Sequence, residues 1–106
     1  LIDDAHFAEV LTRTRFAEKG SSRRAILDEL QRKGVARDLA EQAVEQIDED
    51  EEFEAAVHLA MKKLRTASGK PETLLRRTYA TLARRGFNPG QCSRALREAE
   101  SRLKAS

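Results

Sequence analysis

The sequence predicts an all-α protein made of two tandem three-helix repeats, six helices in all. Of the 106 residues, 36% are charged and only 5% are aromatic, a composition that favours helices over strands. Apolar residues recur along the chain with the 3.6-residue period of a helix. One phrase also occurs twice, at residues 30–35 (LQRKGV) and 82–87 (LARRGF). We expect the repeats to span residues 1–48 and 49–106 and to stack into an elongated, right-handed-type helical array.

The repeated phrase is typical of a corner between two helices. A glycine after a helical run adopts the left-handed conformation at little cost, and the hydrophobe behind it folds back onto the last turn. The basic residues before the glycine suit the negative end of the helix dipole. In the second copy, Asn88 and Pro89 follow as an N-cap and a first helical residue. We therefore expect positive φ angles at Gly34 and Gly86.

The first helix is expected from about Asp3 to Lys19, with Gly20 ending it. It carries two apolar stripes, and we expect the first to face the core and the second to be exposed. The first stripe is Phe7, Val10, Leu11 and Thr14; the second is Ile2, Ala5, Thr12 and Phe16. A globular helix normally buries one stripe, so the second one predicts a partner. We expect a monomer that self-associates through this helix at high concentration.

Two further helices complete the first repeat. Ser21 or Ser22 caps one that runs to Gly34, and another begins near Arg37. Their expected core positions are Ile26, Leu27 and Leu30, then Leu39, Ala43, Val44 and Ile47.

The second repeat begins with the acidic run at residues 48–52, which suits the first turn of a helix. After a short loop, Pro71 opens the fifth helix, and Asn88 caps the sixth. The expected core positions are Phe53, Ala56, Val57, Ala60, Met61, Leu64, Leu75, Thr78, Tyr79, Leu82, Cys92, Ala95, Leu96, Ala99 and Leu103.

Basic residues are concentrated in the second repeat. Residues 1–48 contain 8 basic and 10 acidic groups, and residues 49–106 contain 12 and 8. Because like charges repel, such a cluster indicates an anionic partner, either phosphate or an acidic protein surface. The expected binding residues are Arg32, Lys33, Lys62, Lys63, Arg65, Arg76, Arg77, Arg84, Arg85, Arg94, Arg97 and Lys104.

Residues that carry enzymatic or metal chemistry are sparse. His6 and His58 lack partners at metal-ligand spacing, and His58 is expected on the surface. Cys92 is expected as a small buried thiol. The acidic run lacks the spacing and the glycine of an EF-hand, and the sequence contains no phosphate-binding glycine motif or G-x-S-x-G. We predict a binding protein that is not an enzyme and holds no cofactor and no metal.

The cysteine count and hydropathy indicate a cytoplasmic protein. A single cysteine points to a reducing compartment, and neither a membrane-spanning run nor a signal peptide is visible. The chain begins at Leu1 within helix-like sequence, so we expect further residues upstream of it.

Four motifs resemble the RecX family of regulators of the RecA recombinase. Residues 3–9 (DDAHFAE) resemble the opening of the family's middle repeat, and residues 26–35 resemble its corner. Residues 59–64 (LAMKKL) and 82–87 resemble the two signatures of the closing repeat. The match covers nearly the whole chain in the family's order. It departs at Ser21 and Ser22, where the family often has a proline, and only the second and third of the family's three repeats are recognised.

The resemblance implies a modulator, mainly an inhibitor, of RecA in DNA repair and the SOS response. Proteins of this family bind in the groove of the RecA filament on single-stranded DNA and limit its extension, ATPase and strand exchange. The implied partners are this filament and, weakly and without sequence preference, single- and double-stranded DNA.

Two other interpretations remain open. Residues 84–98 form a candidate helix-turn-helix that would read the major groove as in a transcription factor, although the outward residues of the last helix lack the Asn or Gln that reads adenine. The repeats could instead form a scaffold that binds only protein.

Overall fold

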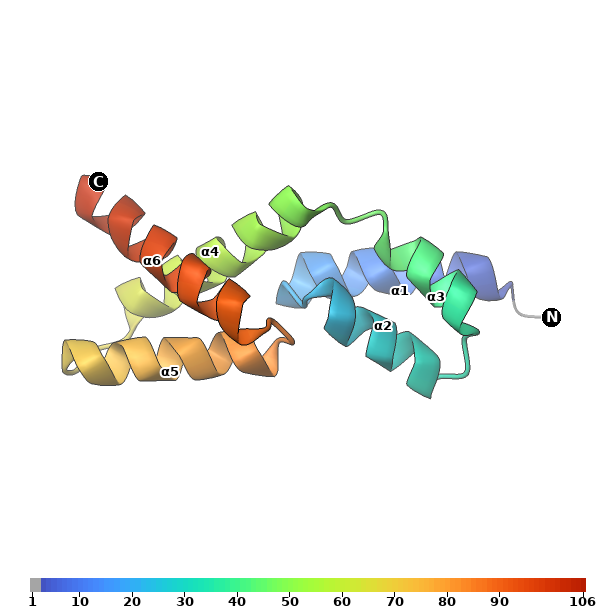
Figure 1. Ribbon diagram of the computed structural model, residues 1–106, viewed down its shortest axis with the longest axis horizontal. Coiled ribbons are helices and arrows are strands. Elements are labelled where there is room, and N and C mark those ends of the chain that lie inside the picture. The colour runs from blue at the N-terminus through green and yellow to red at the C-terminus, as the bar shows by residue number, and fades with distance from the viewer. Residues whose placement is uncertain (1–2) are drawn as a thin grey trace.

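The computed structural model describes residues 3–106, which form six helices and no strand. The first repeat contains α1 (Asp4–Lys19), α2 (Arg23–Arg32) and α3 (Arg37–Val44), and the second contains α4 (Glu49–Thr66), α5 (Pro71–Arg84) and α6 (Pro89–Ala105). The repeats follow one another along the long axis of a molecule that measures 52 × 22 × 22 Å (Figure 1). The prediction of an all-α protein with tandem three-helix repeats is confirmed.

Side-chain caps begin α2, α4 and α6, and the caps of α2 and α6 are the ones that the sequence predicts. The Ser22 side chain accepts from the Ala25 N–H at the start of α2. Capping boxes open the other two, with Asp48 and Glu51 at α4 and with Asn88 and Gln91 at α6. These side chains satisfy backbone N–H groups that have no partner within the helix.

The two corners have the same backbone structure. Gly34 and Gly86 have φ angles of 92° and 96°, as predicted. Val35 and Phe87 each donate a backbone N–H to the carbonyl five residues earlier, at 3.0 and 3.2 Å, and both are buried. This is the hydrogen bond that closes a Schellman ending, and it anchors a large hydrophobe behind each helix.

Each repeat has its own hydrophobic core. The first is formed by Ala8, Ile26, Leu30, Val35, Ala40, Ala43, Val44 and Ile47, and the second by Ala56, Val57, Ala60, Leu82, Phe87, Cys92, Ala95 and Ala99. Neither cluster contains a residue of the other repeat. We therefore propose residue 48 as the end of the first repeat.

The burial of α1 differs from the sequence-based expectation. Phe7 and Val10, expected in the core, are 37% and 41% exposed. Thr12, expected outside, is fully buried and donates its hydroxyl to the Ala8 carbonyl at 2.7 Å. A threonine can satisfy its hydroxyl within its own helix. Thr12 can therefore be buried in the core, although apolar periodicity placed the core on the other stripe of α1.

The stripe expected to mediate self-association is consequently not a free surface. Thr12 is fully buried and Phe16 packs against the first core. Of this stripe, Ala5 is exposed. Ile2 lies outside the described residues. The large apolar residues that α1 exposes are Phe7 and Val10 instead.

Candidate interface for phosphate and acidic protein

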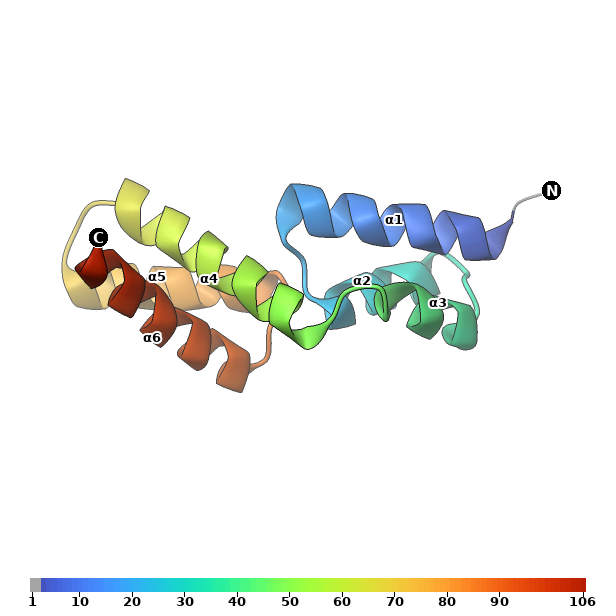
Figure 2. The same cartoon turned by 90° about the horizontal axis from the view of Figure 1, so that it is seen from above.

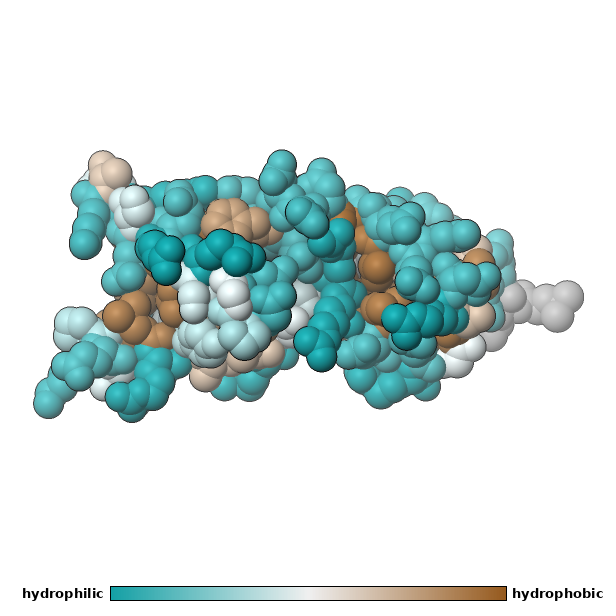
Figure 3. All heavy atoms as spheres, viewed as in Figure 1, coloured by the Kyte–Doolittle hydropathy of each residue, from teal (hydrophilic) through white to brown (hydrophobic). Residues whose placement is uncertain are grey.

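The two repeats use their basic side chains differently. In the first, five of the eight Lys and Arg residues lie within 4.0 Å of a carboxylate: Arg13, Arg15, Arg23, Lys33 and Arg37. In the second, only Arg102 of the twelve does so within residues 3–106, through Glu54 and Glu98. The second repeat therefore presents unpaired positive charge, and the face in Figure 3 is mostly hydrophilic over both repeats.

Three of the twelve predicted binding residues make internal contacts. Arg84 donates to the Thr81 hydroxyl of its own helix at 3.2 Å. Lys33 pairs with Glu29 at 3.8 Å. The guanidinium of Arg85 donates to the Lys19 carbonyl, and Arg85 is half-buried, whereas the other eleven predicted binding residues are exposed. We assign Arg85 to the contact between the repeats and not to a binding surface.

Three predicted residues meet in a hollow between α4 and α5. Lys63, Arg77 and Arg84 line this space of about 340 Å³ together with Leu74 and small side chains, and no acidic residue lines it. Their charges therefore add without local compensation, and the hollow is attractive to an anion.

Arg84 also lines a second hollow, of about 440 Å³, between α2 and the α5–α6 corner. The first repeat contributes Arg24 and Arg32 to it, with Asp28 as its one acidic lining residue. Because Arg84 belongs to both hollows, they adjoin. The name basic groove is used below for their basic residues, which are Arg24, Arg32, Lys63, Arg77 and Arg84.

Arg24 was not among the residues predicted from the sequence. It lies four residues before Asp28 and eight before Arg32, so these side chains share one face of α2. That spacing is a signal that could have identified it. Its neighbour Arg23 is directed instead toward Glu52.

The remaining predicted residues lie apart from the groove. Lys62 and Arg65 line a hollow on the α4–α6 side of the second repeat, with His58 and Arg102. Arg94 lines a hollow that also contains acidic side chains of α4. Arg76, Arg97 and Lys104 are exposed on α5 and α6. The predicted set is therefore not one continuous surface.

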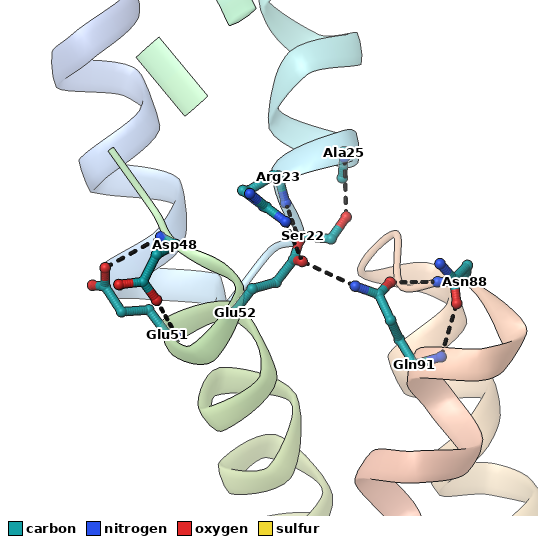
Figure 4. A network of polar contacts seen from close by, with 8 residues as sticks. All are labelled: Ser22, Arg23, Ala25, Asp48, Glu51, Glu52, Asn88 and Gln91. Carbon is teal, nitrogen blue, oxygen red and sulfur yellow. Dashed lines mark hydrogen bonds and ion pairs between the residues drawn. The ribbon is translucent and has the colours of Figure 1, made fainter. Parts of the chain in front are cut away.

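Glu52 is a site residue that the sequence did not reveal. It is 4% exposed and lies at the junction of the repeats (Figure 4). Its carboxylate accepts from the Arg23 backbone N–H at 2.7 Å and from the Gln91 side-chain amide at 2.9 Å. In the sequence Glu52 is the last member of an exposed-looking acidic run, and its burial arises only from contacts with residues far along the chain.

A backbone hydrogen bond adds to this junction. The Ser22 N–H donates to the Arg85 carbonyl at 2.9 Å, and the Arg85 guanidinium donates to the Lys19 carbonyl. The repeats thus meet where the α1–α2 loop approaches the α5–α6 corner (Figure 2). Because the basic groove takes side chains from both repeats, its shape depends on this polar junction.

Side chains capable of catalysis are poorly placed for it. The His58 side chain is 71% exposed, as predicted. Burial raises the pKa of the Cys92 thiol, which lowers its thiolate fraction and its reactivity. In the part of the chain that the structure describes, no group of three or more His, Cys, Asp or Glu could hold a metal ion. No helix among these residues is long and apolar enough to cross a membrane.

Comparison with known proteins gives a consistent result. A family model described as "RecX, second three-helix domain" matches residues 3–44, and one described as "RecX, third three-helix domain" matches residues 49–96. The chain is 38% identical over 99 residues to "Regulatory protein RecX" of Thermobifida fusca, covering 92% of this chain and 54% of that protein. With the protein of the same name from Streptomyces coelicolor it is 39% identical over 100 residues, covering 93% and 53%.

A solved structure shares the fold. The crystal structure of RecX from Lactobacillus salivarius superposes with a TM-score of 0.78 at 23% identity, over 93% of this chain and 65% of that one. The chain spans about half the length of the curated relatives it matches. With both three-helix domains matched in order and the corners and caps in place, the chain belongs to the RecX family.

Proposed function

We propose that this chain binds the RecA filament on single-stranded DNA and limits the filament's extension, ATPase and strand exchange. The name of its relatives, "Regulatory protein RecX", supports a regulatory role. The observation that carries the proposal is the basic groove, in which five unpaired basic side chains from both repeats accompany a single carboxylate, that of Asp28. Such a role belongs to the cytoplasm, where the DNA is.

The groove suits a phosphate backbone for an energetic reason. None of its five basic residues has a carboxylate within 4.0 Å in residues 3–106, so no internal ion pair must break before phosphate binds. If all five contact phosphate, log affinity against log salt should have a slope of about −3.5 on single-stranded DNA and about −4.5 on duplex. Arginine and lysine contacts to phosphate carry no sequence information, so binding should be independent of sequence.

A helix-turn-helix transcription factor is less well supported. Its recognition helix would need a free N-terminal end to approach base edges. In α6 that end lies at the repeat junction, where Gln91 is bonded to Glu52 and to Asn88. Glu49 and Asp50 line the adjoining hollow, and their charges would repel a phosphate backbone.

The test adds the chain to preformed RecA filaments and measures ATP hydrolysis and filament length. The groove variant carries Arg77→Gln and Arg84→Gln, and the matched control carries Arg13→Gln and Arg37→Gln. Each loses two positive charges, but the control residues are exposed in the first repeat and outside the groove. The groove variant should inhibit less and should reduce the DNA salt slope by about 1.4 to 1.8.

The outcomes separate the three functions. Equal inhibition by the groove variant and its control would refute the groove as the binding surface. Loss of DNA binding with unchanged inhibition would favour a protein-only scaffold. Strong preference for one duplex sequence would favour a transcription factor.

A further inference from the structure

The C-terminal half of α4 presents basic side chains on two sides of the helix. Lys63 lines the part of the basic groove that lies between α4 and α5. A separate hollow of about 430 Å³, termed here the α4–α6 hollow, is lined from α4 by His58, Met61, Lys62 and Arg65. At about 100° per residue, these four residues centre about 160° around the helix from Lys63. The groove and the hollow therefore lie on nearly opposite sides of α4.

Two side chains of the hollow are available to an anion. Lys62 and Arg65 are exposed, and neither has a carboxylate within 4.0 Å in residues 3–106. No internal ion pair must therefore break when they bind phosphate. The lining of the hollow contains no acidic residue, so their charges add.

Arg102 of α6 completes the hollow with a donor that is already held in place. Its guanidinium donates to Glu54 at 2.9 and 2.6 Å and to Glu98 at 2.8 Å. These bonds use three of the five N–H groups of an arginine, so two remain for a ligand. The two carboxylates offset the charge of Arg102, and the positive charge of the hollow therefore comes from Lys62 and Arg65.

A single DNA duplex cannot occupy the groove and the hollow together. The molecule is 22 Å across each of its short axes. Duplex DNA bends smoothly only over its persistence length of about 500 Å, which is about twenty times that thickness. It cannot turn around the second repeat from one side of α4 to the other. Phosphate on both sides therefore requires two separate segments.

We propose that the α4–α6 hollow is a second phosphate-binding surface, so that one copy of this chain holds two duplex segments, one in the basic groove and one in the hollow. The inference rests on the proposed function for the phosphate contacts of the groove. It adds an activity that needs no recombinase, the bridging of two DNA segments.

The contact at the hollow is the weaker of the two. At 0.1 M salt each phosphate contact contributes about eightfold in affinity for duplex, so two contacts in the hollow bind about 500-fold more weakly than five in the groove. Copies that lie along one duplex present their hollows together, and their combined contacts compensate for this weakness. Bridging should therefore require duplexes long enough to hold several copies.

A capture experiment measures bridging. A biotinylated duplex of about 150 bp on beads is loaded with the chain, and the amount of a second, fluorescent duplex that the beads retain is measured. Retention should rise as the chain is added. It should fall again when the chain is in excess, because each duplex is then covered by its own copies.

Two variants locate the second surface. Lys62→Gln with Arg65→Gln is the hollow variant, and the matched control is again Arg13→Gln with Arg37→Gln. The hollow variant should bind one duplex with an unchanged salt slope of about −4.5, because the groove is intact. It should retain at least tenfold less of the second duplex, since two lost contacts are worth about 60-fold at 0.1 M salt. The control should retain as much as the unmodified chain.

A mixture of variants distinguishes a bridge made by one copy from a bridge made by two associated copies. The hollow variant and the groove variant, Arg77→Gln with Arg84→Gln, each lack one of the two surfaces. Their equimolar mixture should not restore retention, because both surfaces must belong to the same copy. Restored retention would show that associated copies form the bridge and would refute the proposal.

Two other outcomes would also refute it. The first is equal retention by the hollow variant and the control; weaker inhibition of RecA filaments by that variant would then assign the hollow to an acidic protein surface. The second is an unmodified chain that binds one duplex and retains no second one, which would leave the proposed function intact. An unchanged salt slope in the groove variant would instead refute the groove, and with it the proposed function.

Discussion

Replacing Gly86 with alanine should destabilise the protein more than the same replacement at Gly34. The two residues have φ angles of 96° and 92°, so the backbone strain on a β-carbon is nearly equal at both. That strain costs about 1–2 kcal/mol, and the stiffer unfolded chain offsets about 0.4–1 kcal/mol of it. We expect a net loss of about 1 kcal/mol at Gly34.

The surroundings of Gly86 add a second cost. Its new Cβ would lie 2.5 Å from the Ala25 Cβ and 3.3 Å from the Ala25 Cα, well inside the normal separation of about 3.5–4.0 Å between carbons. Overpacking of this kind costs about 1–3 kcal/mol. The total loss at Gly86 should therefore be about 2–4 kcal/mol unless the repeats separate, in which case the Ser22 N–H loses its bond to the Arg85 carbonyl.

Denaturant unfolding with two probes distinguishes these responses. Circular dichroism reports on all six helices, whereas the fluorescence of Tyr79, the one tyrosine in a chain without tryptophan, reports on the second core. Faster amide exchange at Ser22 would detect separation of the repeats in Gly86→Ala. Equal losses of stability in the two variants, with unchanged exchange at Ser22, would refute the close approach at Gly86.

Three further perturbations test other contacts. Phe16→Ser should lower the free energy of unfolding by about 2–3 kcal/mol, because Phe16 packs against the first core. An unchanged free energy of unfolding in denaturant titrations would contradict this packing. Glu52→Ala should cost about 1–3 kcal/mol and speed exchange of the Arg23 amide, which loses its acceptor; full protection of that amide would contradict the role of Glu52. The hydrogen bond from Arg15 holds the pKa of Glu29 below its usual value of 4.5, so the stabilisation by this pair is complete above that pH and is lost as pH falls through the lower folded-state pKa. Arg15→Gln should therefore show a weaker acid dependence of the denaturation midpoint between pH 7 and 3, and an unchanged dependence would argue against the pair.

Local structure was predictable because it depends on residues a few positions apart. Gly34 and Gly86 end their helices as the sequence indicates, and Ser22 and Asn88 form the expected caps with residues three positions later. The core stripe of α4 was also predictable, since its apolar residues leave one face that can be buried.

The candidate interface was only partly predictable. Lys63, Arg77 and Arg84 were expected as binding residues, and the structure places them in one hollow. The sequence counts such charges but does not say which of them find carboxylates or share a groove. Arg24 lines the groove although the sequence did not predict it as a binding residue. Arg85 was predicted but donates to the Lys19 carbonyl of the other repeat instead.

The sequence by itself determined the helices, their corners and caps, the doubling of the three-helix unit and the excess of positive charge in its second copy. The tertiary structure decided which stripe of α1 is buried and that Glu52 joins the repeats. The physical reason is the range of the interactions. A cap or corner is closed by hydrogen bonds within one turn, whereas Glu52 is buried by Arg23 and Gln91, which lie 29 and 39 residues away in the chain.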